Sequence, residues 1–246
     1  MKKKKQQIIK FYPFSEKILD FAPEPKPASK YMPEWYRQQP GLIDTGETLA
    51  TTGQPASTVK KCLPIFDTIT AGYVIVAPVD IYLDATDPEK LVYQIPATMS
   101  QFKAEIFAYH DRRQYSHMPL DENVYHKDLL RIMPFWVVGT SPGYSALFTN
   151  PFYRDSSPIT ALSGIIDTDG YPSDGHLSFT VEKDFKGVIK QGTPLVQIIP
   201  FKREDWKMEI VDAEESEKFL RKNRMRLRST FNNGYKNKFR SPKEYK

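Results

Sequence analysis

Two aspartates separated by a single residue are the clearest candidates for chemistry in this sequence. Asp167 and Asp169 follow the apolar stretch 161–166 and open a turn that is rich in Gly, Pro and Ser. A carboxylate at such a strand-to-turn position is held rigidly and can accept a proton from water. The alternative is a turn in which both short carboxylates cap backbone amides. The sequence leaves both interpretations open.

Three of the four histidines form a second group of candidates. His110, His117 and His126 lie among several carboxylates, and imidazole with carboxylate can ligate zinc or iron. Their spacings of seven and nine residues match no helical or hairpin metal signature. We therefore expect polar surface or pocket residues here, and we predict no metal ligands.

Charge is strongly segregated along the chain. Residues 1–10 carry five lysines and no acid, and residues 218–246 carry eleven Lys and Arg against Glu244 alone. Because the whole chain carries +5, the residues between these ends carry about −10. Basic ends can contact nucleic acid or anionic surfaces, or can pack on the acidic body of the same or a neighbouring subunit. For the aromatic and basic tail after Thr230, strapping across an acidic, partly apolar groove is the favoured alternative.

The expected cellular compartment is inferred from the cysteine content, the polarity of the N-terminal residues and the length of the apolar runs. Cys62 is alone, so we expect no intrachain disulfide and a reducing environment. The N-terminal lysines are followed by a run too polar for a secretory signal, and no apolar run reaches eighteen residues. We expect a protein without a membrane span, located in the cytoplasm, or in a host cytoplasm or virion if a phage encodes it.

Short apolar runs between turns predict a mainly β chain of three parts. The parts are a basic strand, proline-rich arm and loop over 1–57, a β core over 58–211, and a helix with a basic aromatic tail over 212–246. Strands are expected over 7–12, 58–67, 71–83, 91–95, 132–138, 142–149, 176–182, 194–201 and 208–211. Residues 101–109 fit either a helix or a strand. A short helix is expected over 30–37 and a longer one from Asp212 to Arg228, because acids begin it and bases end it.

The segments 164–171 and 189–199, taken as a pair, carry a family resemblance. Gly164-Ile-Ile-Asp-Thr-Asp-Gly-Tyr171 and the later Lys-Gln-Gly turn with its apolar strand resemble motifs of the dUTPase and dCTP deaminase superfamily. Residues 70–73 and 142–148 fit earlier motifs in order. The likeness spans about residues 58–205 and is specific only across 142–201. The Met32-Pro-Glu-Trp-Tyr36 arm also resembles a family of tailed-phage and bacterial proteins, which implies no function.

The superfamily resemblance implies a jelly-roll-like β-barrel, usually trimeric, with nucleotide sites shared between subunits. By motif position, Asp167 would activate water, Tyr171 would stack near a sugar or base, and Gln197 would support the phosphate side. Gly164 and Asp169 of the same motif are further ligand-binding candidates. Arg154 is the one arginine left as a phosphate ligand, and Mg²⁺ would accompany a hydrolase.

Departures from the family's motifs keep two function classes open. Val74 stands where the family places an acid, Gly170 is an insertion, and Thr193-Pro194 replace an Asp-Arg pair. No Gly-rich phosphate clamp follows. The first class binds a nucleotide or related phosphorylated ligand and hydrolyses its pyrophosphate with Asp167 as general base, with deamination as the less favoured reaction. The second is a non-catalytic oligomeric β-barrel that acts as a phage structural or interaction protein.

Overall fold

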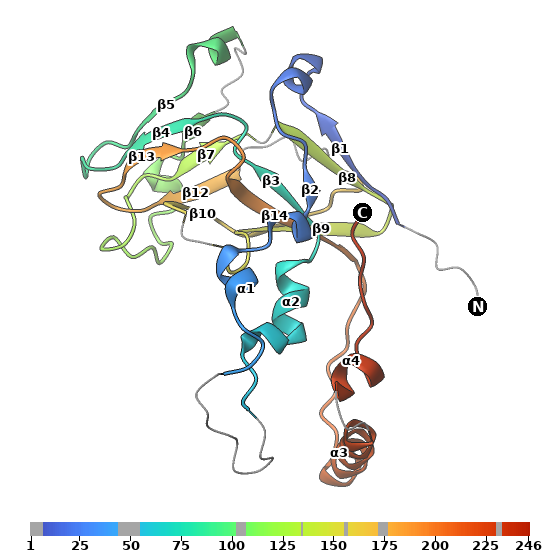
Figure 1. Ribbon diagram of the computed structural model, residues 1–246. Coiled ribbons are helices and arrows are strands. Elements are labelled where there is room, and N and C mark those ends of the chain that lie inside the picture. The colour runs from blue at the N-terminus through green and yellow to red at the C-terminus, as the bar shows by residue number, and fades with distance from the viewer. Residues whose placement is uncertain are drawn as a thin grey trace.

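The protein is mainly β, with antiparallel strands in several sheets (Figure 1). The computed structural model describes residues 7–43, 55–101, 107–133, 135–154, 157–171, 177–229 and 233–246. The strands are β1 (Ile9–Pro13), β2 (Lys26–Pro27), β3 (Tyr73–Val76), β4 (Ile81–Asp84), β5 (Val92–Gln94), β6 (Phe107–Tyr109), β7 (Leu130–Ile132), β8 (Trp136–Thr140), β9 (Tyr144–Thr149), β10 (Ile159–Ala161), β11 (Gly164–Ile166), β12 (Leu177–Val181), β13 (Lys186–Ile189) and β14 (Pro194–Lys202).

Helices are fewer and lie outside the sheets. The α-helices are α1 (Glu34–Gln38), α2 (Leu63–Ile69), α3 (Ala213–Arg228) and α4 (Gly234–Lys238). Short 3-10 helices are η1 (Glu16–Asp20), η2 (Ala28–Tyr31), η3 (Val59–Lys61), η4 (Ala97–Gln101) and η5 (Arg112–Gln114). None of the described helices is long and apolar enough to cross a lipid bilayer.

The sheets share one hydrophobic core. Their strand orders are β11-β9-β14-β3-β2, β10-β12-β7-β6 and β13-β4-β5, with β1 and β8 as a separate pair. Alternate side chains of these strands point inward, as the two-residue period of a strand requires. Leu83, Phe148, Phe179 and Ile198 belong to this core and are almost completely buried. The predicted fold class, a mainly β chain with an N-terminal arm and a C-terminal helix followed by a basic tail, is confirmed.

The N-terminal arm adds strands to these sheets and packs against them. β1 pairs with β8, and β2 pairs with β3. The indole of Trp136 donates a hydrogen bond to the carbonyl of Pro23 at 3.0 Å. Tyr36 of α1 is buried and its ring lies near that of Phe66, so the aromatic part of the arm packs on α2.

Four strand predictions are wrong, namely 58–67, 71–83, 132–138 and 208–211; the stretch 132–138 is divided between the end of β7 and the start of β8. Residues 58–67 form η3 and most of α2, since Pro64 suits the first turn of a helix and the Thr68 hydroxyl donates back to its carbonyl at 2.9 Å. The stretch 71–83 is divided into β3 and β4 by residues 77–80, which include Pro78. Residues 208–211 belong to no sheet, because no backbone hydrogen bond joins them to another residue in the described part of the chain. The ambiguous stretch 101–109 ends in β6, and residues 102–106 of it lie outside the described part of the chain.

Gly72 occupies a position that only glycine tolerates. Its φ is +68°, and an added Cβ would lie 1.9 Å from the carbonyl oxygen of Ile198. The backbone before β3 therefore passes directly against β14. This contact fixes the distance between α2 and the central sheet.

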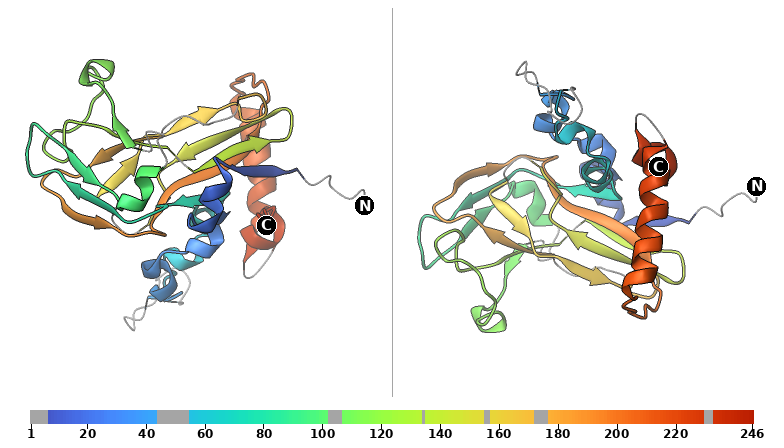
Figure 2. Two further views of the ribbon diagram at one scale, coloured as in Figure 1. Left: turned by 90° about the horizontal axis from the view of Figure 1, so that it is seen from above. Right: turned by 90° about the horizontal axis from the view of Figure 1, so that it is seen from below.

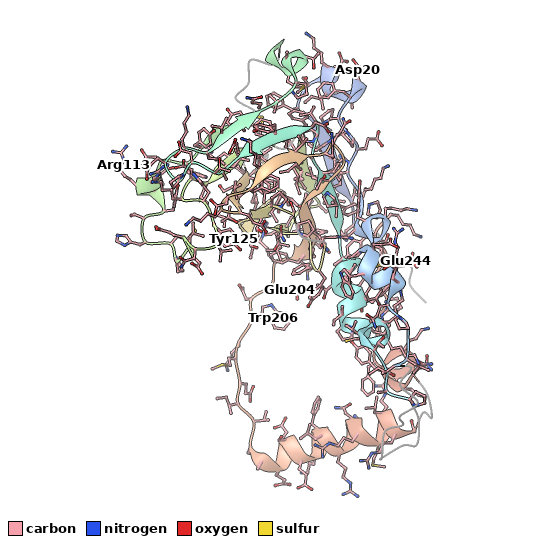
Figure 3. All side chains as sticks on the ribbon, turned by 60° about the vertical axis from the view of Figure 1, so that its left-hand side comes forward. Asp20, Arg113, Tyr125, Glu204, Trp206 and Glu244 are labelled. Carbon is pink, nitrogen blue, oxygen red and sulfur yellow. The ribbon has the colours of Figure 1, made fainter. Side chains whose placement is uncertain are left out.

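The C-terminal part of the chain leaves the sheets and returns to them. We call residues 204–229 and 233–239 the C-terminal handle (Figures 1 and 3). Asp212 begins α3 as predicted, because its side chain accepts a hydrogen bond from the Glu215 amide at 2.9 Å. Past the handle, Arg240 forms an ion pair with Asp67 of α2 at 2.6 Å. The tail thus straps over an acidic residue of its own body, as the sequence favoured.

Aromatic contacts complete this attachment. The ring of Tyr245 meets the ring of Tyr73 edge-on at 5.9 Å, and the Tyr73 hydroxyl donates to the carbonyl of Lys246 at 3.1 Å. Burial raises the pKa of Tyr245. The end of the chain is therefore held at the edge of β3.

Candidate functional site

The turn that carries the two aspartates is held from its backbone. The amides of Gly170 and Tyr171 both donate to the carbonyl of Asp167, at 3.1 and 3.0 Å. The buried hydroxyl of Thr168 lies 2.8 Å from the hydroxyl of Thr140 in β8. Both its own amides and the neighbouring strand β8 therefore hold the turn.

Asp169 is bound by an arginine that no sequence pattern assigns to this turn. Arg203 donates to the two carboxylate oxygens of Asp169 at 2.8 and 2.5 Å, and the Gly143 amide adds a third hydrogen bond at 2.7 Å. Only 13% of the Asp169 side chain is exposed. The Arg203 hydrogen bonds, followed by that from Gly143, lower the pKa of Asp169 to about 2. Asp169 is therefore an anion whose oxygens are committed to protein donors.

Asp167 keeps more of its carboxylate in solvent. Its side chain is 67% exposed and lies 3.3 Å from the Arg203 guanidinium. The buried Ser145 hydroxyl donates to Asp167 at 2.6 Å. One oxygen of Asp167 thus has fixed partners, while the exposed part of the group can accept a hydrogen bond from outside the chain.

Arg203 connects three segments at this point. Its guanidinium reaches the turn after β11 and donates to the carbonyl of Tyr144 at 3.3 Å, where β9 begins. Its own amide donates to the carbonyl of Gly143 at 2.9 Å. Arg203 lies in a run of charged residues after β14, and neither period nor spacing relates it to Asp169. Only the folded arrangement shows the pairing.

Tyr171 lies at the rim of a cleft beside this turn. Its side chain is 55% exposed, and the cleft is bordered by Lys10, Tyr12 and the end of β8. Its volume of about 690 Å³ lies in the range of small-molecule sites. Gly164 lies on the other side of the turn, in the terminal strand β11, and no atom lies within 4 Å of where its Cβ would be.

Arg154 binds the N-terminal arm rather than joining this turn. Its guanidinium donates to the carbonyls of Ala28 and Ile69, at 3.1 and 3.3 Å. It borders a different groove, formed by α1, β10 and β13. Its role as a phosphate ligand stays a prediction.

Gln197 is fully buried within β14. Its amide nitrogen donates to the carbonyls of Thr68 and Ala71 at 3.0 and 2.7 Å, and its oxygen accepts from the Phe152 amide at 3.1 Å. These contacts join the end of α2 to the central sheet. A ligand role for Gln197 also stays a prediction.

Two of the three histidines, His110 and His126, contact neighbouring groups, whereas His117 is exposed. His110 lies 2.9 Å from the Gln114 side-chain oxygen and 2.5 Å from the Ser178 hydroxyl. His126 is buried and lies 2.9 Å from the carbonyl of Asp87. Among the residues that the structure describes, no three His, Cys, Asp or Glu side chains form a group that could hold a metal ion.

The aspartate turn does not suit the Mg²⁺ that a hydrolase would need. Mg²⁺ binds through carboxylate and water oxygens in octahedral geometry. Here the guanidinium of Arg203 faces both Asp167 and Asp169, and a fixed positive charge repels a divalent cation. The two aspartates are therefore ion-pair partners of Arg203, and this arrangement does not suit a magnesium ion.

Comparison with known proteins gives distant structural similarity. No protein-family model and no curated protein matches the sequence. Among solved structures, the chain is similar to a point-mutant dUTPase from phage phi11 of S. aureus, a structure that reveals the coordination of a structural Mg(II) ion in that protein. The TM-score is 0.35 at 13% identity, over 85% of this chain and 99% of that one. Similarity at this level assigns neither a family nor residue roles to the chain.

Proposed function

We propose that this chain is a non-catalytic β protein that works by binding protein subunits, copies of itself included. The observation that carries the proposal is the exposed face of the handle. Trp206, Met208 and Ile210 occupy alternate positions of an extended segment and are 84–88% exposed. Burying such a side chain contributes roughly 1.5–3 kcal/mol each, and contiguous exposed apolar surface marks interaction sites.

The contacts at the aspartate turn support this proposal. Asp169 is committed to Arg203 and to a backbone amide, and Arg203 connects β14, β9 and the turn. Arg154 and Gln197 hold backbone groups elsewhere in the fold. The residues proposed for phosphate chemistry thus make contacts that stabilise the fold.

Mass in solution tests the proposal. The full chain, at micromolar concentration, should sediment as an oligomer of its 28.4 kDa chain, with a trimer as the expected form. The triple variant Trp206→Ser, Met208→Ser, Ile210→Ser should sediment as a monomer. The matched control is Lys207→Ser, Glu209→Ser, which changes the other side of the segment at constant net charge and should keep the oligomer. A monomeric wild-type chain would overturn the proposal.

A second candidate function rests on Asp167 and Tyr171. Both are more than half exposed, and Tyr171 borders the cleft beside the turn. A nucleotide or related phosphorylated ligand in this cleft could stack on Tyr171 and meet the ammonium of Lys10. Asp167 would take a proton from water, whose oxygen would attack phosphorus while the bond to the bridging oxygen breaks and the leaving phosphate carries the electron pair away.

Ligand screening separates the two candidates. Nucleoside triphosphates, diphosphates and nucleotide sugars should raise the melting temperature if the second candidate is right, and Asp167→Asn should abolish turnover without lowering the melting temperature. Absence of any thermal shift across the set would remove this candidate. Ser229→Ala, at the C-terminal cap of the distant helix α3, serves as the control variant.

A further inference from the structure

Residues 204–211 form a segment that lies outside the sheets and has no regular secondary structure. No backbone hydrogen bond joins them to any other described residue, and every one of them is exposed. Trp206, Met208 and Ile210 alternate with polar residues over most of the segment, which is the pattern of a strand with one apolar face. Figure 3 shows Glu204 and Trp206 on the part of the handle that leads away from the sheets. Such a segment can satisfy its backbone by adding to an open sheet edge.

The body has an open sheet edge at β13, and apolar side chains lie beside this edge as they do along the segment 204–211. Among the strands of the described residues, β13 is the last of its sheet and pairs only with β4. Val188 at its centre is 44% exposed. β10 is the last strand of another sheet, and both strands border one groove, which we call the β10–β13 groove. Apolar side chains that line it are Ile159, Phe185, Val188, Ile189 and Pro194.

Charge on the two elements is complementary. The segment 204–212 carries Glu204, Asp205, Glu209 and Asp212 against Lys207, a net charge of −3. The residues that line the groove include Lys30, Arg37, Arg154 and Lys190 against Glu34 and Glu182, a net charge of +2, which becomes +1 when Asp80, the ion-pair partner of Lys190, is included. Lysines on a free edge normally discourage pairing with another strand. An acidic strand is attracted by these lysines, so the edge at β13 favours pairing with a segment of the composition of 204–212.

The segment cannot reach this groove on its own chain without crossing the body. Arg203 fixes its beginning at Gly143 and Asp169, next to β9. In Figures 1 and 2 the helices of the handle lie on one side of the sheets, and β4, β5 and β13 lie on the opposite side. Docking in the groove therefore requires a second molecule.

We propose that residues 204–212 of one chain pair with β13 of a second copy, with Trp206, Met208 and Ile210 packed in the β10–β13 groove. This inference rests on the proposed function and names the surface through which the copies bind. The donor supplies the strand and the acidic charge. The acceptor supplies the open edge, the apolar lining and the basic rim.

Complementation between two defective variants tests the inference. The donor-defective variant is Trp206→Ser, Met208→Ser, Ile210→Ser, and the acceptor-defective variant is Val188→Glu, which places a carboxylate where an acidic strand must lie. Each should weaken self-association by about 30-fold or more. Val188→Thr keeps the β-branched shape without charge and should retain the oligomer. Melting temperatures of all variants establish that they fold.

Mixing the two defective variants should restore a 1:1 complex, because the acceptor-defective chain still has its strand and the donor-defective chain still has its groove. Sedimentation with one chain fluorescently labelled detects that complex. If Val188→Glu remains oligomeric while the donor-defective variant is monomeric, the groove assignment is wrong and the proposed function stands. If both remain oligomeric, the handle is not the interface. Two monomeric variants that do not combine would exclude pairing between chains.

Discussion

Arg203 and Asp169, 34 positions apart, share two hydrogen bonds at 2.8 and 2.5 Å. Arg203 directly follows β14, and Asp169 belongs to the turn after β11. The position of the acidic turn therefore depends on the strand that leads into the handle. A change in either partner should affect both the turn and the start of the handle.

This pairing predicts a pH dependence of stability. Since the folded-state pKa of Asp169 is lowered to about 2, its contribution is complete above the unfolded pKa of about 4 and is lost as the pH falls from about 4 to about 2. Asp169→Asn should remove this part of the acid sensitivity. Urea unfolding at pH 7, 4 and 3 measures it as the difference in unfolding free energy between wild type and variant. Glu16→Gln, an exposed carboxylate lacking any described ion pair, is the control, and an equal pH slope for Asp169→Asn and wild type would contradict the prediction.

Gln197 should matter for stability whether or not a ligand binds. Replacing it with Leu leaves two carbonyls and one amide without their partner in a buried position. We expect a loss of about 2–4 kcal/mol in the free energy of unfolding, measured by urea denaturation. Gln38→Ala changes an exposed glutamine in α1 and should stay within about 0.5 kcal/mol. Similar values for the two variants would show that the buried contacts contribute little.

Two glycines should respond very differently to alanine. Gly72→Ala places a Cβ 1.9 Å from the Ile198 carbonyl oxygen at a positive φ, so we expect a loss of at least about 3 kcal/mol or failure to fold. Gly164→Ala meets no atom within 4 Å and should change stability by less than about 0.5 kcal/mol. Thermal and urea melts compare them. A stable Gly72→Ala protein would contradict the close approach of β3 and β14.

The attachment of the tail to α2 should control protease access to the handle. Arg240→Ala removes a paired guanidinium from Asp67, whose pKa the Arg240 hydrogen bond lowers. We expect about 1.5–3 kcal/mol less stability for the docked tail and faster tryptic cleavage of residues 218–238. Lys236→Ala, a basic residue of the same tail that stays exposed, is the matched variant. Unchanged cleavage rates in Arg240→Ala would show that the tail is held by its aromatic contacts alone.

Local patterns explain why much of the fold could be predicted from the sequence. Alternation and apolar runs located most strands, and the acidic start and basic end of 212–228 located α3. The errors come from competing local signals. Pro64 favours a helix start, and the hydroxyls of Thr68 and Thr70 donate to carbonyls of the same helix, so this apolar run forms α2. Residues 77–80, which include Pro78, interrupt the stretch 71–83 that was predicted as one strand.

The candidate site was predictable only where its residues are adjacent in the chain. The sequence predicts a turn at Asp167 and Asp169 because these two short acidic residues follow an apolar strand. Arg203 could not be assigned to that turn, since its partner lies 34 positions away and is brought close only because β9 pairs with both β14 and β11. The burial of Gln197 was equally hidden, because it depends on α2 folding as a helix.

The handle leaves the body at Arg203 and returns to it at Arg240. A force applied to the handle by a bound partner therefore acts on two attachments at once. These are the pairing of β14 with β9 and the ion pair between Arg240 and Asp67 of α2. Tension is divided between them in parallel instead of being concentrated at one flexible joint. A tail with a free end would peel away residue by residue, whereas this arrangement resists mechanical load from both ends.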